Sequence, residues 1–122
     1  YINNNLKDTQ ARIIMTLYTA DGKDYFKNCT SFTGLSLIDT SNCTTLNRSF
    51  RGLEKITSLD IGHFDISNVK SLYQTFCYCK KLTSLPIENW DVSNVTNMRS
   101  MFRLSKFTGK NSNLNNNKKT TS

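Results

Sequence analysis

Hydrophobic residues recur along this chain in a pattern that repeats every 26 positions. In each period apolar residues first alternate with polar ones, as in residues 56–61 and 82–87, which is typical of a short β-strand. The apolar spacing then changes to i, i+3, i+7, as in Val69, Leu72 and Phe76, which indicates one face of a short helix. We therefore expect each period to hold a strand, a turn and a short helix.

The turn between the two elements is the best preserved part of the period. Asp65-Ile66-Ser67-Asn68-Val69 recurs one full period later as Asp91-Val92-Ser93-Asn94-Val95, and a degenerate copy begins at Asp39. Side chains of Asp, Ser and Asn favour turns because they accept hydrogen bonds from nearby backbone N–H groups. Residues 55–79 and 81–105 are identical at ten of 25 positions. A repeat of this length is typical of a solenoid or array.

These elements predict an α/β fold, a short right-handed solenoid of about three coils of 24–26 residues. Stacked coils would place the strands in a parallel sheet and the helices on the opposite side. The solenoid is expected to span residues 26–108. Residues 1–25 are expected to form an N-terminal segment and a β-hairpin cap, because β-branched residues precede Asp21-Gly22. Residues 109–122 are rich in Asn and Lys and are expected to be a disordered tail.

Composition fits one domain with a lean core. The chain has 122 residues, of which 37% are hydrophobic and 20% charged. This low hydrophobic fraction is compatible with a solenoid, because each coil buries only one face against each neighbour. The longest apolar run is far too short to span a membrane. The chain begins at Tyr1 and shows no secretory signal, so we expect a fragment or a mature form, and the missing signal carries no information about location.

The net charge of +7 is unevenly distributed, since no acidic residue follows Asp91. Arg99, Arg103 and Lys106 are therefore candidates for binding an anionic ligand; the alternative is a solvated tail without a ligand. No nucleic-acid-binding module is recognisable, so no specific nucleic acid is expected as a partner.

The residues that carry chemistry in other proteins have structural explanations here. Asp39, Asp65 and Asp91 recur once per coil, which favours a turn-forming role over an active site, and each carboxylate should be offset by turn N–H groups. The asparagines of the same turn, Asn42, Asn68 and Asn94, are expected to bond turn backbone or form a ladder. His63, the only histidine, has no paired nucleophile or acid motif, and Phe64 and Trp90 are expected in the core.

No catalytic motif, metal site or cofactor site is recognisable, and we expect neither enzyme activity nor a cofactor. The four cysteines lack zinc-site spacing. Cys43 stands where later coils have Val, so we expect it to pack as a small hydrophobe. Thiols are expected, and a Cys29–Cys43 disulfide is the alternative.

The segment from Phe76 to Phe102, with Trp-Asp-Val-Ser-Asn-Val-Thr-Asn-Met-Arg-Ser-Met-Phe at its end, resembles the repeat of BspA-like bacterial surface proteins. In particular it resembles the branch found in mycoplasma-type lipoproteins. The resemblance covers roughly residues 26 to 105. It implies a leucine-rich-repeat-like solenoid outside the cell or at its surface, used for adhesion or protein binding, and it implies no catalytic residues.

Three functions follow as hypotheses. The first is a repeat module that binds a protein or glycan partner, with exposed strand positions as candidates: Ser58, Asp60, Ser84 and Glu88. The second is a structural spacer that self-associates through an open C-terminal end near Phe102 and Leu104. The third is binding of an anionic polymer by the basic residues after Asp91.

Overall fold

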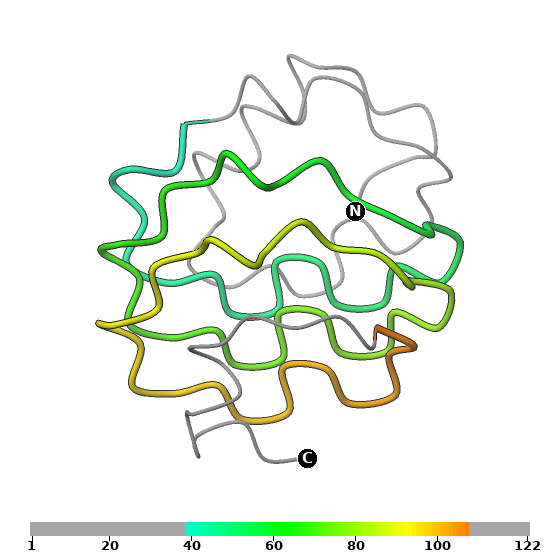
Figure 1. Cartoon of the computed structure of the whole chain (residues 1–122). Coiled ribbons are helices and arrows are strands. Elements are labelled where there is room, and N and C mark those ends of the chain that lie inside the picture. The colour runs from blue at the N-terminus through cyan, green and yellow to red at the C-terminus, as the bar shows by residue number, and fades with distance from the viewer. Residues whose placement is uncertain (1–38, 108–122) are drawn as a thin grey trace.

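The computed structural model describes residues 39–107. These residues wind through stacked turns of chain, which we call coils (Figure 1). The first coil comprises residues 39–64, the second residues 65–90, and the third begins at residue 91. The expected hairpin cap, most of the short first repeat and the expected tail lie outside the described residues.

Backbone hydrogen bonds join the coils along one segment of each period. We call residues 44–52, 70–78 and 96–104 the turn segments. In the first two, every second N–H from Leu46 and Leu72 onward donates to a carbonyl of the next coil, as from Leu46 to Ser71 at 3.0 Å and from Leu72 to Asn97 at 2.8 Å. Parallel bridges pair Ser71 with Thr45 and with Asn97. The period of the sequence is therefore the spacing at which successive coils bond.

The short helices expected at residues 69–76 and 95–102 are absent; residues 39–107 contain no helix. Each turn segment is a succession of tight turns instead, such as the one closed by the bond from Thr75 N–H to the Leu72 carbonyl at 3.2 Å. Residues four apart point inward in such turns much as they would in a helix. The apolar spacing alone could not separate the two structures, and the helix prediction was wrong.

Positive φ angles at two repeat positions explain why no helix forms. Arg48, Gln74 and Ser100 occupy the first position, with φ between 54° and 56°. The second position holds Gly52, Tyr78 and Leu104, with φ of 80°, 60° and 58°. A residue in this left-handed region reverses the chain locally, so the helical i to i−4 bonding cannot continue. The N–H groups bond to the neighbouring coil instead.

The strands expected at residues 56–61 and 82–87 reduce to one residue pair. Ser58 and Ser84 form a parallel bridge, and the N–H of Thr83 donates to the Thr57 carbonyl at 3.0 Å. Leu59 and Ile61 are buried on either side of exposed Asp60, so the alternation itself is confirmed. The solenoid as a fold class, its right-handed winding and its hairpin cap stay predictions.

Aromatic rings form a stacked column through the middle of the core. The rings of Phe50, Phe76 and Phe102 lie 5.8 and 5.7 Å apart, with interplanar angles of 3° and 6°. Phe64 and Trp90 stack in a second column with centroids 6.4 Å apart. Both are buried, which confirms that these two residues belong to the core. Cys43 packs against this core as expected.

Several buried polar groups find their partners in the preceding coil. The Trp90 indole N–H donates to the Ile61 carbonyl at 3.1 Å, and the Cys79 thiol lies 3.0 Å from the Phe50 carbonyl oxygen. Each of these bonds joins a side chain to the backbone of the coil before it. They fix the register of the stack, because a shift by one residue would leave buried polar atoms without partners.

Two substitutions at one buried repeat position, that of Ser49 and Thr75, are expected to change the free energy of unfolding in opposite directions. The Thr75 hydroxyl donates to the Leu46 carbonyl at 3.0 Å, whereas the buried Ser49 hydroxyl, one coil earlier, has no hydrogen-bond partner among residues 39–107. We expect Thr75→Val to lower the free energy of unfolding by about 1 kcal/mol and Ser49→Ala to raise it by a similar amount. Urea unfolding followed by circular dichroism measures both. Equal destabilisation by the two changes would contradict this assignment.

Candidate binding surfaces

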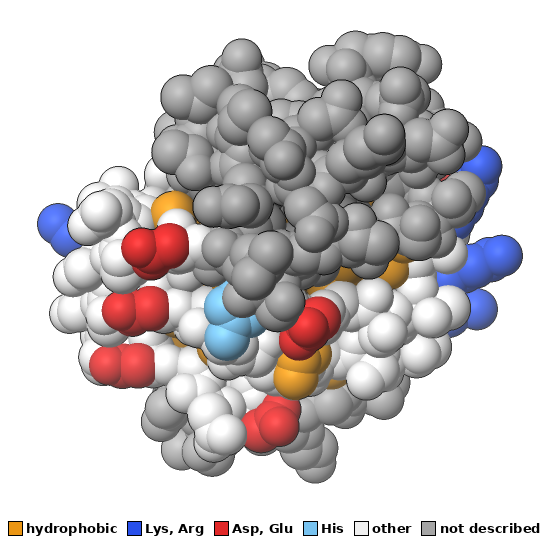
Figure 2. Space-filling view, turned by 90° about the horizontal axis from the view of Figure 1, so that it is seen from above, with side chains coloured by type: hydrophobic (Ala, Val, Ile, Leu, Met, Phe, Trp, Pro, Cys, Tyr) orange, Lys and Arg blue, Asp and Glu red, His pale blue; other side chains and the backbone are white. Residues whose placement is uncertain are grey.

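The repeated turn of each coil places one aspartate at the molecular surface. In each case the Asp Oδ1 accepts a hydrogen bond from the N–H of the serine two positions further on, at 2.9 to 3.0 Å. Figure 2 shows a row of acidic side chains along one edge of the coils, with most basic side chains near the opposite edge. The three residues of this aspartate column are Asp39, Asp65 and Asp91.

Hydrogen bonds keep these stacked carboxylates ionised. The hydroxyl and the backbone N–H of Ser67 lower the pKa of Asp65 below its ordinary value of 3.8, and they outweigh desolvation and the like charges of Asp39 and Asp91. Bonds from the matching serines lower the pKa of the other two aspartates. The structural role expected for this column is therefore supported by its geometry, since each carboxylate closes its own turn.

The asparagines of the same turn join neighbouring coils. The side-chain amide of Asn68 donates to the Ser41 carbonyl at 2.9 Å, and that of Asn94 donates to the Ser67 carbonyl at 2.6 Å. These bonds match the expected contact with turn backbone. Asn42 is exposed, and the coil that would precede it lies outside the described residues.

The four residues predicted to bind a partner on the strand side are all exposed: Ser58, Asp60, Ser84 and Glu88. Asp60 lies in the loop that follows Ser58, and Glu88 lies in the loop that follows Ser84. His63, which lies between Asp60 and Glu88 in the sequence, is also exposed. Its ring contacts the Phe64 ring edge-on, with ring centroids 5.0 Å apart. We call this surface the bridge face; it consists of Ser58, Asp60, His63, Ser84 and Glu88 and offers two hydroxyls, two carboxylates and one imidazole.

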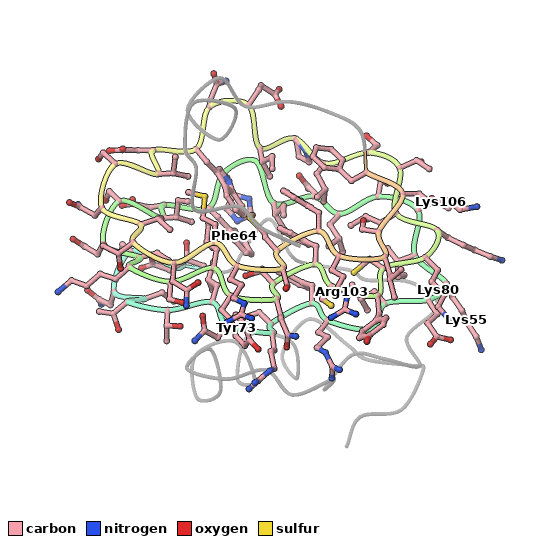
Figure 3. The ribbon with its side chains drawn as sticks, turned by 90° about the horizontal axis from the view of Figure 1, so that it is seen from below. Lys55, Phe64, Tyr73, Lys80, Arg103 and Lys106 are labelled. Carbon is pink, nitrogen blue, oxygen red and sulfur yellow. The ribbon has the colours of Figure 1, made fainter. Side chains whose placement is uncertain are left out.

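A second surface lies on the turn segments and carries larger side chains. The guanidinium of Arg48 sits over the Tyr73 ring at 5.1 Å from its centroid, and that of Arg51 sits over the Tyr78 ring at 5.0 Å. Figure 3 shows Tyr73 and Arg103 projecting at this side of the molecule. We call this surface the arginine–tyrosine face; it consists of Arg48, Arg51, Tyr73, Tyr78, Arg99 and Arg103.

The three basic residues predicted to bind an anionic ligand do not lie on one surface. Arg99 and Arg103 are exposed on the arginine–tyrosine face. Lys106 is also exposed, but it shares a repeat position with Lys80 and projects from the same edge of the coils as Lys80 and Lys55 (Figure 3).

Sequence reasoning missed the two tyrosines and the two earlier arginines. The signal that could have found them is variation between coils at one repeat position. Core positions keep their chemistry, as Phe50, Phe76 and Phe102 do, whereas one outward position holds Asn47, Tyr73 and Arg99 in turn. Asn47 and Tyr73 are half-buried and Arg99 is exposed, so close packing does not impose one residue type at this position.

The C-terminal end of the described chain covers the last aromatic ring. Phe107 packs on Phe102 with ring centroids 5.1 Å apart, and Leu104 beside it is 58% exposed. The Phe107 N–H also donates to the Ser105 hydroxyl at 3.2 Å. The apolar end expected to be open for self-association is therefore partly closed by the chain's own residues.

Within residues 39–107 no three His, Cys, Asp or Glu side chains are arranged to hold a metal ion. The same part of the chain contains no helix with the length and hydropathy needed to cross a bilayer.

The hydrogen-bonded period defines this chain as a repeat protein. Residues 20–122 match the model of a family described as Mycoplasma protein of unknown function, DUF285. This match spans most of the 122 residues, so the chain belongs to that family. It agrees with the mycoplasma branch of the resemblance. Comparisons with curated proteins and with solved structures found no match.

The aspartate column predicts a specific loss of stability in acid. Because hydrogen bonds lower the folded-state pKa of all three carboxylates below 3.8, their contribution to stability is present above that pH. It is lost as the pH falls through the lowered folded values. We expect the triple variant Asp39→Asn, Asp65→Asn, Asp91→Asn to remove part of this dependence, since an Asn carbonyl can still close the turn. Urea midpoints measured well above and well below pH 3.8 test this; identical acid profiles for variant and parent would contradict it.

Proposed function

We propose that this chain is a non-catalytic repeat module of a bacterial surface protein and that it binds a protein or glycan partner in adhesion. The observation that carries the proposal is the division of repeat positions into two kinds. The aromatic core position of Phe50, Phe76 and Phe102 keeps its chemistry from coil to coil, whereas the position of Asn47, Tyr73 and Arg99 changes it. A stack of equal coils with varied outward side chains is an extended recognition surface of the kind that solenoids use.

The contacts within the coils support a binding role more than a chemical one. The aspartates close their own turns, two of the three asparagines bond the preceding coil, and Trp90 is buried in the core. These groups are used in holding the stack together. On the arginine–tyrosine face Arg99 and Arg103 are exposed, and its other four residues are half-buried.

Location at the cell surface rests on two supports of different kinds. The repeat sequence resembles that of bacterial surface proteins, and the chain belongs to a Mycoplasma family. Both are compatible with a module that faces the environment of the cell. A structural spacer would use the same stack, but the packing of Phe107 on Phe102 leaves less apolar surface at that end for another subunit.

The proposal predicts saturable binding of the folded chain to candidate host cells. Fluorescently labelled chain is titrated onto the cells by flow cytometry, with circular dichroism to verify folding. We expect a dissociation constant in roughly the micromolar range and loss of binding on denaturation. Linear uptake without saturation, or equal binding of denatured chain, would contradict the proposal.

Two pairs of exposed substitutions then locate the binding surface. Ser58→Lys with Ser84→Lys alters the bridge face, and Arg99→Gln with Arg103→Gln alters the turn segments. All four residues are exposed, so neither pair should disturb the core. We expect one pair to weaken cell binding about tenfold, through lost contacts or new steric and charge conflict, and the other to leave it within about twofold. Equal, small effects of both pairs would place the partner elsewhere.

A further inference from the structure

The charge on the turn segments is of one sign. Residues 44–52, 70–78 and 96–104 contain four arginines and one lysine and no acidic residue. The acidic residues of the described chain lie in the repeated turns or in residues 54–60 and 88. An anion that approaches the turn segments therefore meets cations without a competing carboxylate from the same segments.

Two of these guanidinium groups are held in place before any ligand binds. The Arg48 Nε donates to the Gln74 Oε1 of the next coil at 2.9 Å, and the same guanidinium lies over Tyr73. Arg51 lies over Tyr78, one turn further along the segment, and its Nε atom is buried. An immobilised guanidinium loses less entropy on binding than a mobile surface side chain, so its oxyanion contact is more favourable.

The remaining arginines extend the surface along the stack. Arg99 occupies the repeat position of Tyr73 in the following coil, and Arg103 occupies that of Arg51 two coils later. Two coils span roughly 10 Å, twice the spacing of neighbouring strands. Cations thus flank the tyrosines on both sides, in an arrangement suited to a linear ligand with repeated negative groups.

We propose that the arginine–tyrosine face binds an acidic polysaccharide, whose sulfate or carboxylate groups contact the guanidiniums. This inference rests on the proposed function and specifies its partner. Guanidinium groups bind carboxylates and tetrahedral oxyanions such as phosphate through paired N–H donors; sulfate offers the same tetrahedral geometry. A single-stranded nucleic acid is less favoured, because binding of that kind needs aromatic ring faces open to bases. Here both tyrosines are half-buried, and each has a guanidinium over its ring.

The experiment compares three ligands and two charge-matched variants of the full chain. Heparin, chemically desulfated heparin and polyuridine RNA are titrated at physiological salt by fluorescence anisotropy. Arg99→Gln with Arg103→Gln removes two charges from the face, and Lys80→Gln with Lys81→Gln removes two exposed charges from another edge. We expect the arginine pair to weaken heparin binding about tenfold and the lysine pair to weaken it less than about twofold.

Each outcome bears on the inference. Selective loss with the arginine pair supports it, and the desulfated arm shows whether sulfate or carboxylate supplies the contact. Equal loss with both pairs would show binding to net charge alone and overturn it. RNA binding as tight as heparin binding would overturn it in favour of nucleic acid. Saturable cell binding without affinity for either heparin would overturn this inference while the proposed function stands.

Discussion

The structure depends on backbone hydrogen bonds that run from one coil to the next. Because alternate N–H groups of a turn segment donate to carbonyls at the matching places of the following coil, successive turn segments must have the same length. A residue inserted within a turn segment would shift the N–H groups that follow it and leave them without acceptors. The regular spacing of residues within the turn segments follows from this constraint.

Side chains then make the register unique. Stacking of Phe50 on Phe76 and of Phe76 on Phe102 places like residues above one another, and the amides of Asn68 and Asn94 link each turn to the one before. A repeated column of carboxylates would oppose stacking, but each is stabilised locally by its own serine donors. Each aspartate therefore stays ionised in the stack, because the hydrogen bonds to its carboxylate outweigh the repulsion from the carboxylates of neighbouring coils.

The need to fit a neighbouring coil applies to positions inside the stack and not to positions at its surface. The aromatic position of Phe50, Phe76 and Phe102 repeats because a neighbouring ring must fit against each of these rings at close-packed density. Positions that face solvent on the turn segments have no such requirement, and they differ from coil to coil. It is there that the guanidiniums of Arg48 and Arg51 lie over tyrosine rings of the next coil.

The sequence by itself determined the period, the buried aromatic positions and the residues of the Asp-x-Ser-Asn turn, since these follow from residue identity at fixed spacing. The path of the turn segments was decided by the tertiary structure alone. Apolar residues at Leu72 and Phe76 suit a helix or a series of tight turns equally, and positive φ at Gln74 is adopted because the adjacent coil offers carbonyl acceptors. The arginine–tyrosine face likewise required the structure, because its contacts join residues of different coils that lie far apart in the sequence, as from Arg48 to Tyr73 and from Arg51 to Tyr78.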